Sequence, residues 1–143
     1  IVQCGGSGLL GNALIKSLAA AGATLDVVTR STASVEPSLT TERALGHPVH
    51  VEEADVTNEA SMLALSNRLR STHGRVDGMV YNVVSRPMKG EGAELAQWEE
   101  SMKVNAVGFF LILRTFADLI AAQPAGGSIV NISSIMGMIG ANP

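Results

Sequence analysis

The sequence predicts an α/β domain built on a doubly wound parallel sheet. Short apolar segments alternate with segments of helical periodicity along the chain, and a glycine-rich turn joins the first apolar segment to the first helical one. Hydrophobic residues make up 46% of the 143 residues and charged residues 16%, as expected when helices cover both faces of the central strands. Right-handed crossovers then favour the strand order 3-2-1-4-5. We expect one domain over residues 1–143.

Five short strands are predicted, at residues 1–4, 25–29, 49–51, 78–81 and 128–132. Helical spacing predicts helices over residues 12–21, 59–72 and 95–122. The segment 31–46 is polar and contains Pro37, so it is predicted to be a loop with some helix. The side chains expected on the inner faces of the first two helices are Ala13, Leu14, Leu18, Ala21, Met62, Leu63, Leu65 and Leu69.

Composition argues against several classes of function. The net charge of -3 disfavours a nucleic-acid surface, which needs a basic patch. The single cysteine, Cys4, excludes an internal disulfide and a cysteine-rich zinc site, and His47, His50 and His73 are too scattered to suggest another metal site. No uninterrupted apolar run is long enough to cross a bilayer, and no signal peptide is recognisable. We therefore expect a cytoplasmic protein that acts on a small molecule, without metal, nucleic acid or membrane.

The glycine-rich turn has the sequence Gly5-Gly6-Ser7-Gly8-Leu9-Leu10-Gly11. Gly5 permits a tight turn out of the strand, Gly8 leaves room for a pyrophosphate at the backbone, and Gly11 allows close packing of helix on sheet. The amide groups and the dipole at the start of the helix favour an anion there. The whole turn is therefore predicted to bind a dinucleotide, and a tight turn without a ligand is the alternative.

The end of the second strand predicts which dinucleotide binds. NAD sites usually have a carboxylate there for the ribose 2′-hydroxyl, whereas this chain has Thr29 and Arg30. A guanidinium group can pair with the 2′-phosphate of NADP, which a carboxylate would repel. Asp26 lies too early in the strand to reach the ribose. We therefore predict that the cofactor is NADP(H), with NAD(H) as the alternative. The alternative role for Arg30 is a solvated surface charge that contacts no cofactor.

Together with four further motifs, the turn makes the chain resemble the short-chain dehydrogenase/reductase family, in its single-domain branch, over essentially its whole length. The pair Asp55-Val56 after the third strand is similar to the family's adenine-binding pair. Asn82 follows the fourth strand, where the family has Asn-Asn-Ala-Gly. Asn105 matches the asparagine of the family's long helix, and Ser134 matches its active-site serine. The motifs occur in the family's order along the chain.

The resemblance implies a Rossmann-fold oxidoreductase that transfers a hydride between a nicotinamide cofactor and a ketone or secondary alcohol. In the family, a tyrosine is the acid/base, a lysine four residues later lowers its pKa, a serine orients the substrate oxygen and an asparagine helps to hold a water. The last two roles would fall to Ser134 and Asn105. The resemblance also implies that Asn82, Val83 and Val84 contact the cofactor.

Several alternatives stay open on sequence grounds. Ser133 competes with Ser134, and Asn105 could be a polar group satisfied within the core. Val83 and Val84 replace the family's alanine and glycine, so a non-catalytic dinucleotide-binding protein is one alternative. The spacing Gly-x-x-Gly-x-x-Gly is commoner in the extended branch, so a sugar-nucleotide epimerase or dehydratase is another. Tyr81, the only tyrosine, is interpreted as a packing residue, because no lysine lies four residues after it.

We expect the chain to be the N-terminal part of a longer protein. The first residue already lies in an apolar strand, and Pro143 is reached before the expected tyrosine and lysine, so the fragment alone should be inactive. The helix at 95–122 contains Phe109, Phe110, Leu113 and Phe116 and is more apolar than one sheet face requires. The resemblance implies a homodimer or homotetramer paired through this helix.

Overall fold

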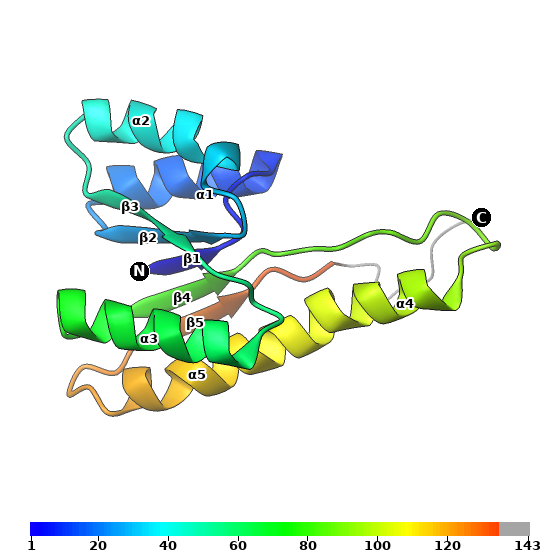
Figure 1. Cartoon of the computed structure of the whole chain (residues 1–143). Helices are drawn as coiled ribbons and strands as arrows, with labels where there is room; N and C mark the ends of the chain where they lie inside the picture. The colour runs from blue at the N-terminus through cyan, green and yellow to red at the C-terminus, as the bar shows by residue number, and fades with distance from the viewer. Residues whose placement is uncertain (135–143) are drawn as a thin grey trace.

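The computed structural model describes residues 1–134 as a five-stranded sheet with helices on both faces (Figure 1). The strands are β1 (Val2–Cys4), β2 (Leu25–Thr29), β3 (Val49–Glu53), β4 (Gly78–Tyr81) and β5 (Ser128–Asn131). They pair in the order β3-β2-β1-β4-β5, and every pairing is parallel. The predicted fold class and strand order are confirmed.

The helices are α1 (Leu9–Ala20), α2 (Glu36–Ala44), α3 (Glu59–His73), α4 (Leu95–Met102) and α5 (Phe109–Ala121). A short 3-10 helix, η1 (Thr32–Ser34), precedes α2, and a π-helical segment, η2 (Lys103–Gly108), joins α4 to α5. In Figure 1, α1 and α2 lie on one side of the sheet, and α3 and α5 lie on the other. The loop after β4 and helix α4 extend beyond the carboxyl ends of the strands.

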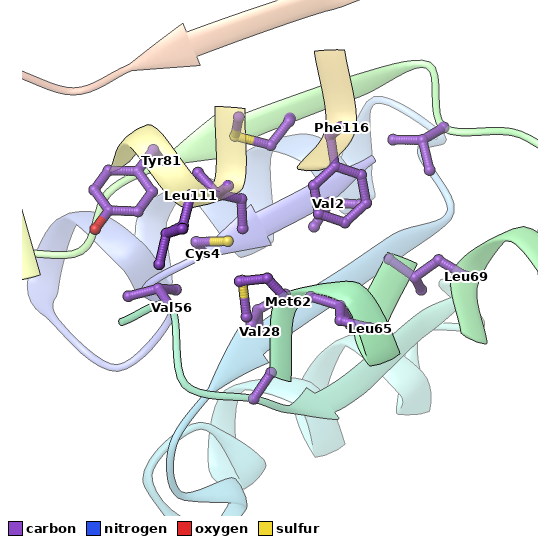
Figure 2. Close-up of a cluster of buried hydrophobic side chains, with 14 of the residues drawn as sticks. Val2, Cys4, Val28, Val56, Met62, Leu65, Leu69, Tyr81, Leu111 and Phe116 are labelled. Atoms are coloured by element: carbon purple, nitrogen blue, oxygen red, sulfur yellow. The ribbon is translucent and has the colours of Figure 1, made fainter. Parts of the chain in front are cut away.

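The larger core lies between the sheet and the helices α3 and α5. Figure 2 shows Val2 and Cys4 of β1 facing Met62 and Leu65 of α3 and Phe116 of α5. Each of these side chains is at most 1% exposed. Full burial of one large apolar side chain contributes about 1.5–3 kcal/mol, so this layer fixes β1 and the turn that follows it.

The buried face of α1 differs from the predicted one. The helix begins at Leu9, within the glycine-rich segment, and Ile15 and Ala19 pack on the sheet, whereas Ala13 and Ala21 are exposed. Gly11 sets this phase because it lies inside the first turn of the helix and directly against the backbone of the glycine turn. The pattern of apolar residues alone did not contain that constraint.

The segment 31–46, predicted as a loop with some helix, is helical over most of its length. Pro37 falls in the first turn of α2, where its missing N–H removes no intrahelical hydrogen bond. Val35 and Leu39 are fully buried in a smaller core with residues of α1, β2 and β3. These two buried residues hold the helix against α1. The mostly polar composition of the segment did not predict this contact.

Helix α3 confirms three of its four predicted inward residues. Met62, Leu65 and Leu69 are buried in the larger core. The prediction for Leu63 is wrong, since its side chain is 59% exposed. With 3.6 residues per turn, the face through 62, 65 and 69 continues through Ser66, which is buried in its place.

The continuous helical segment Leu95–Ala121 has 27 residues and a mean hydropathy of 1.7 in its most apolar window, so length and composition alone would allow it to cross a bilayer. In the structure, α5 instead contacts α3, β4 and β5. Its residues Ile112, Phe116 and Ile120 are buried in the larger core. These are the contacts of a core helix.

Candidate functional site

A cavity of about 970 Å³ lies at the carboxyl ends of the strands, where doubly wound sheets bind their ligands. Every residue predicted for the site lines it: Gly5, Ser7, Gly8, Leu9, Leu10, Gly11, Thr29, Arg30, Asp55, Val56, Asn82, Val83, Val84, Asn105 and Ser134. Ser133 lines it as well. The fold therefore brings together segments from the ends of all five strands, although their cofactor and catalytic roles stay predictions.

Two glycines hold the turn between β1 and α1 in close contact with its surroundings. Gly5 has φ +88°, and a Cβ there would lie 2.8 Å from the backbone carbonyl group of Asn82. A Cβ on Gly11 would lie 2.5 Å from the carbonyl oxygen of Gly5. The Asn82 side chain closes the arrangement, because its Nδ2 donates to the Gly5 oxygen at 3.1 Å. Neither glycine has room for a side chain.

Gly8 is different, since the space around it is open. It is the N-cap of α1 with extended backbone (φ -87°, ψ 174°), and a Cβ there would meet no atom within 4 Å. The first amide groups of α1 are unpaired within the helix and attract anions. The turn thus fits a dinucleotide pyrophosphate: it has an open approach at Gly8 and amide donors beside it.

The end of β2 presents Arg30 to the cavity. Thr29 Oγ1 accepts from the Ser31 amide at 3.2 Å and donates to the Ser31 carbonyl at 3.1 Å, which fixes the turn around the arginine. Arg30 itself is exposed and makes no ion pair with any residue from 1 to 134. Asp26 is only 3% exposed and contacts His73 Nε2 at 3.1 Å, at a second cavity away from the glycine turn. A role for Asp26 at the ribose is thereby excluded.

Asp55 follows β3 and is held in place by its own turn. Its Oδ1 accepts from the Thr57 amide and the Thr57 hydroxyl, both at 2.8 Å. Burial alone would raise the pKa of the carboxyl, but the Thr57 hydrogen bonds and the charges of Arg30 and Lys103 outweigh it and hold the pKa below its usual range. Within the described chain no hydrogen bond engages Oδ2, so this oxygen can accept from a ligand.

This depressed pKa predicts an acid-dependent loss of stability. The ionised form of Asp55 stabilises the fold above its ordinary pKa of 3.8, and the contribution disappears as the pH falls through the lower folded pKa. The difference in unfolding free energy between the wild type and Asp55→Asn should therefore shrink as the pH falls from about 5 to about 2.5, because asparagine does not titrate. Urea unfolding of both proteins at stepped pH measures it. A difference in unfolding free energy that stays constant over that pH range would contradict a stabilising role of the ionised Asp55 carboxylate.

Asn105 connects the long helix to the loop after β4. Its Oδ1 accepts from the Ser85 amide and its Nδ2 donates to the Ser85 carbonyl, both at 2.8 Å, while Nδ2 also donates to Ser101 Oγ at 3.1 Å. Asn105 lies in the π-helical segment η2, and such segments often occur at functional sites. The side chain is thus committed to holding Ser85, a contact that the sequence did not reveal.

Tyr81 is a packing residue, as the sequence predicted. It is 2% exposed, its ring lies 5.4 Å from that of Phe109, and its hydroxyl donates to the Val104 carbonyl at 2.7 Å. Burial raises the pKa of the hydroxyl well above its usual range. Figure 2 places the ring in the larger core beside Leu111. Although Tyr81 is among the residues that line the cavity, its hydroxyl hydrogen is engaged by the Val104 carbonyl.

Sequence reasoning missed several polar residues in or beside the site, Thr57, Ser85 and Arg86 among them. Thr57 could have been found, because an aspartate commonly accepts from the residue two positions on, as Asp55 does here. Ser85 and Arg86, both on the cavity wall or beside it, belong to an irregular loop without a periodic signal. Their placement depends on Asn105, twenty residues further along the chain.

The sheet, the glycine turn and the cavity define a dinucleotide-binding protein of the doubly wound class. A family model described as short chain dehydrogenase matches residues 1–142. The chain therefore belongs to the short-chain dehydrogenase family, whose members are oxidoreductases that bind nicotinamide cofactors. The family resemblance predicted from the motifs is confirmed.

Known relatives match the chain over nearly its full length. Sorbitol-6-phosphate 2-dehydrogenase of Escherichia coli is 33% identical over 143 residues, covering 97% of this chain and 55% of that protein. Galactitol 2-dehydrogenase of Rhizobium johnstonii is 33% identical over 141 residues, covering 96% and 54%. The structure of a metagenomic short-chain oxidoreductase in complex with NADP has a TM-score of 0.88 at 27% identity, covering 99% of this chain and 63% of that one. The chain spans about half the length of the curated relatives it matches.

Proposed function

We propose that the whole protein is an NADP(H)-dependent oxidoreductase that transfers a hydride between the nicotinamide and a ketone or secondary alcohol. One observation carries the proposal: a single cavity is lined by the glycine turn at Gly8, by Arg30, which makes no ion pair within residues 1–134, and by Asn105 and Ser134. The turn offers amide donors to a pyrophosphate, and Arg30 offers a cation to a 2′-phosphate. Asn105 and Ser134 offer polar groups to a reacting carbonyl.

The cofactor would lie across the carboxyl ends of the strands. The amides at the start of α1 would bind its pyrophosphate beside Gly8, and Arg30 would pair with the 2′-phosphate. Asp55 Oδ2 would accept from the adenine amino group, and Asn82 to Val84 would contact the nicotinamide ribose. The bound nicotinamide supplies or accepts the hydride. The relative solved with NADP supports this assignment by similarity.

The chain's own residues would orient the substrate. The Ser134 hydroxyl would donate to the substrate oxygen, where negative charge develops during reduction. Asn105 would act as a positioning residue, since its amide group holds the backbone of Ser85, which lies between the lining residues Val84 and Arg86. The proton would come from a tyrosine and lysine of the whole protein outside residues 1–143, because the one tyrosine of this chain is sealed in the core. The chain alone would then be inactive.

The relatives' names support an alcohol substrate. The two curated relatives described above are named as 2-dehydrogenases of a polyol phosphate and of a polyol, and both compounds contain secondary alcohols. Ser134 and Asn105 both line the cavity, and polar residues of this kind suit a small polar molecule of that type. A cytoplasmic location remains a prediction for the whole protein.

The NADP assignment is tested by replacing Arg30 with alanine in the whole protein. The wild type is expected to bind NADPH more tightly than NADH, and Arg30→Ala should weaken NADPH by about tenfold, the loss of one charge-assisted pair. NADH binding should stay within about twofold, since NADH has no 2′-phosphate. Fluorescence titration with both cofactors measures this, and Arg70→Ala on the exposed face of α3 is the matched control. Equal affinity of the wild type for both cofactors would refute the assignment.

A second candidate function is favoured by one observation at the nicotinamide end. Val84 lines the cavity with its side chain 56% exposed, so a branched side chain stands where the family motif has glycine. A protein that binds the dinucleotide without reducing a substrate would tolerate the branched side chain of Val84 at this position. The Val84→Gly variant separates the two: it should leave turnover unchanged or raise it in an enzyme, and create none in a binding protein.

We further propose that the whole protein forms a homodimer or homotetramer through the helix at 95–122. Several large apolar side chains of this segment are exposed: Leu95, Trp98, Met102, Val107 and Phe110. Leu95, Trp98 and Met102 recur at helical spacing on α4, so they form one stripe. Apolar stripes of this kind usually mark an interaction surface.

A further inference from the structure

The loop after β4 places a second arginine, Arg86, on the cavity lining. Arg86 is exposed, lines the cavity, and makes no hydrogen bond or ion pair with any residue that the structure describes. Arg30 and Arg86 are the cationic residues on the described lining, and Asp55 is the one carboxylate there. The charge of Arg30 is one of the causes that lower the pKa of Asp55. Within residues 1–134, Arg86 has no hydrogen-bond or ion-pair partner that would compete with a ligand.

Strand order separates the two arginines along the cavity. Arg30 follows β2, whereas Arg86 follows β4, which lies beside β5. Neighbouring strands are about 4.8 Å apart, so β2 and β4, with β1 between them, are separated by about 10 Å. Arg86 accordingly belongs to the end of the cavity that contains Asn105 and Ser134, and Arg30 belongs to the opposite end.

The backbone on both sides of Arg86 is restrained. Asn105 holds the amide and the carbonyl of Ser85 with two hydrogen bonds of 2.8 Å. Pro87 has a fixed φ and also limits the residue before it to extended conformations. The guanidinium group thus extends from a fixed point, which lowers the entropy lost when it binds a ligand.

We propose that Arg86 binds an anionic group of the substrate, a phosphate or a carboxylate, so that the enzyme acts on anionic ketones and alcohols. The proposal rests on the proposed function, because it assumes that the substrate carbonyl lies beside Ser134. A guanidinium group pairs with either anion through two parallel hydrogen bonds, and a partly enclosed cavity strengthens such pairs. Arg86 contributes binding and orientation, and no bond is made or broken at it.

The test compares neutral ketones with related ketones that carry a phosphate or a carboxylate, using the whole protein and NADPH. The pairs are fructose with fructose 6-phosphate, and methyl levulinate with levulinate. The wild type should favour the anionic member by at least about tenfold in kcat/KM. Arg86→Met keeps the length of the stem and should lose that preference, with kcat/KM for the neutral member within about twofold. Arg86→Lys should restore part of it, and Arg70→Met, on the exposed surface of α3, should behave as the wild type.

A second measurement does not depend on turnover. Calorimetry of the NADP⁺-saturated protein with levulinate and with inorganic phosphate should show binding that Arg86→Met weakens by at least about tenfold. The phosphate and carboxylate arms show which anion the site prefers. If Arg86→Met weakens NADP⁺ itself as much as the anions, the arginine serves the cofactor and the proposal is wrong.

The remaining outcomes separate the two proposals. Reduction of neutral and anionic ketones at equal rates, unchanged in Arg86→Met, would refute the anion site and leave the oxidoreductase intact. Absence of any turnover, combined with anion binding that depends on Arg86, would refute the oxidoreductase and support the anion site. Anion binding that is absent, or unaffected by Arg86→Met, would refute the anion site in either case.

Discussion

Replacing Gly8 by aspartate is expected to abolish dinucleotide binding while leaving the fold as stable as before. The backbone at Gly8 is extended and a Cβ there meets no atom within 4 Å, so a side chain can be added without a clash. Aspartate is a favoured N-cap and differs from the glycine now at this position by only about a few tenths of a kcal/mol, so the stability of α1 should hardly change. Its carboxylate would occupy the anion position and repel the pyrophosphate. The dissociation constant for NADPH should rise at least about 100-fold.

Gly11→Ala is the matched comparison, because a side chain at this position of the same turn is expected to lower the stability of the fold. Its Cβ would lie 2.5 Å from the Gly5 carbonyl oxygen, and backbone atoms cannot move aside as a flexible side chain can. Overpacking of this kind costs about 1–3 kcal/mol or more, a large fraction of a typical domain's stability. Gly8→Ala separates the effect of charge from that of size.

Urea unfolding and NADPH titration of the three variants measure both quantities. Gly8→Asp should unfold like the wild type and fail to bind, whereas Gly11→Ala should unfold at lower urea. If Gly8→Asp binds NADPH with wild-type affinity, the pyrophosphate is not held at this turn and the site assignment fails.

The 143-residue chain by itself is expected to show no turnover. General acid catalysis contributes typically about 10²–10⁴-fold, and the whole protein's proton donor would be missing. Tyr81 cannot replace it, because its hydroxyl is buried and donates to the Val104 carbonyl. A Cβ on Gly108 would lie 2.6 Å from that hydroxyl, which shows how closely the helix covers it.

NADPH oxidation by the purified chain, free of the whole protein, measures this with ketones that the whole protein reduces. Tyr81→Phe in the whole protein is the control: kcat should stay within about twofold, while stability falls by about 1 kcal/mol for the lost hydrogen bond. Turnover by the isolated chain, or a large loss of kcat in Tyr81→Phe, would contradict the account.

The fold was predictable from sequence because its signals are local. Strand–helix alternation and the glycine turn predict the parallel sheet and its order, which the structure confirms. The predictions were wrong where tertiary contacts determine which residues are buried or whether a segment is helical. Gly11 sets the phase of α1 through contact with the turn, and Leu39 turns a polar segment into a helix by burial in the smaller core.

The candidate site was predictable only where a motif exists. All motif residues line one cavity, from the glycine turn to Ser134. The Asn105–Ser85 contact and the position of Arg86 are absent from any short pattern, because they join a π-helical segment to an irregular loop twenty residues earlier. A resemblance places Asn105 at the site, whereas only the coordinates show what its amide group holds.

The central claim is that this cavity transfers a hydride between NADP(H) and a carbonyl compound. The most direct test uses the whole protein with NADPH deuterated at the transferred position of the nicotinamide, and analyses the alcohols formed from the neutral and anionic ketones by mass spectrometry. The account predicts deuterium on the carbinol carbon of the product. Tight NADPH binding without label in any product would contradict it and would favour a dinucleotide-binding protein without catalysis.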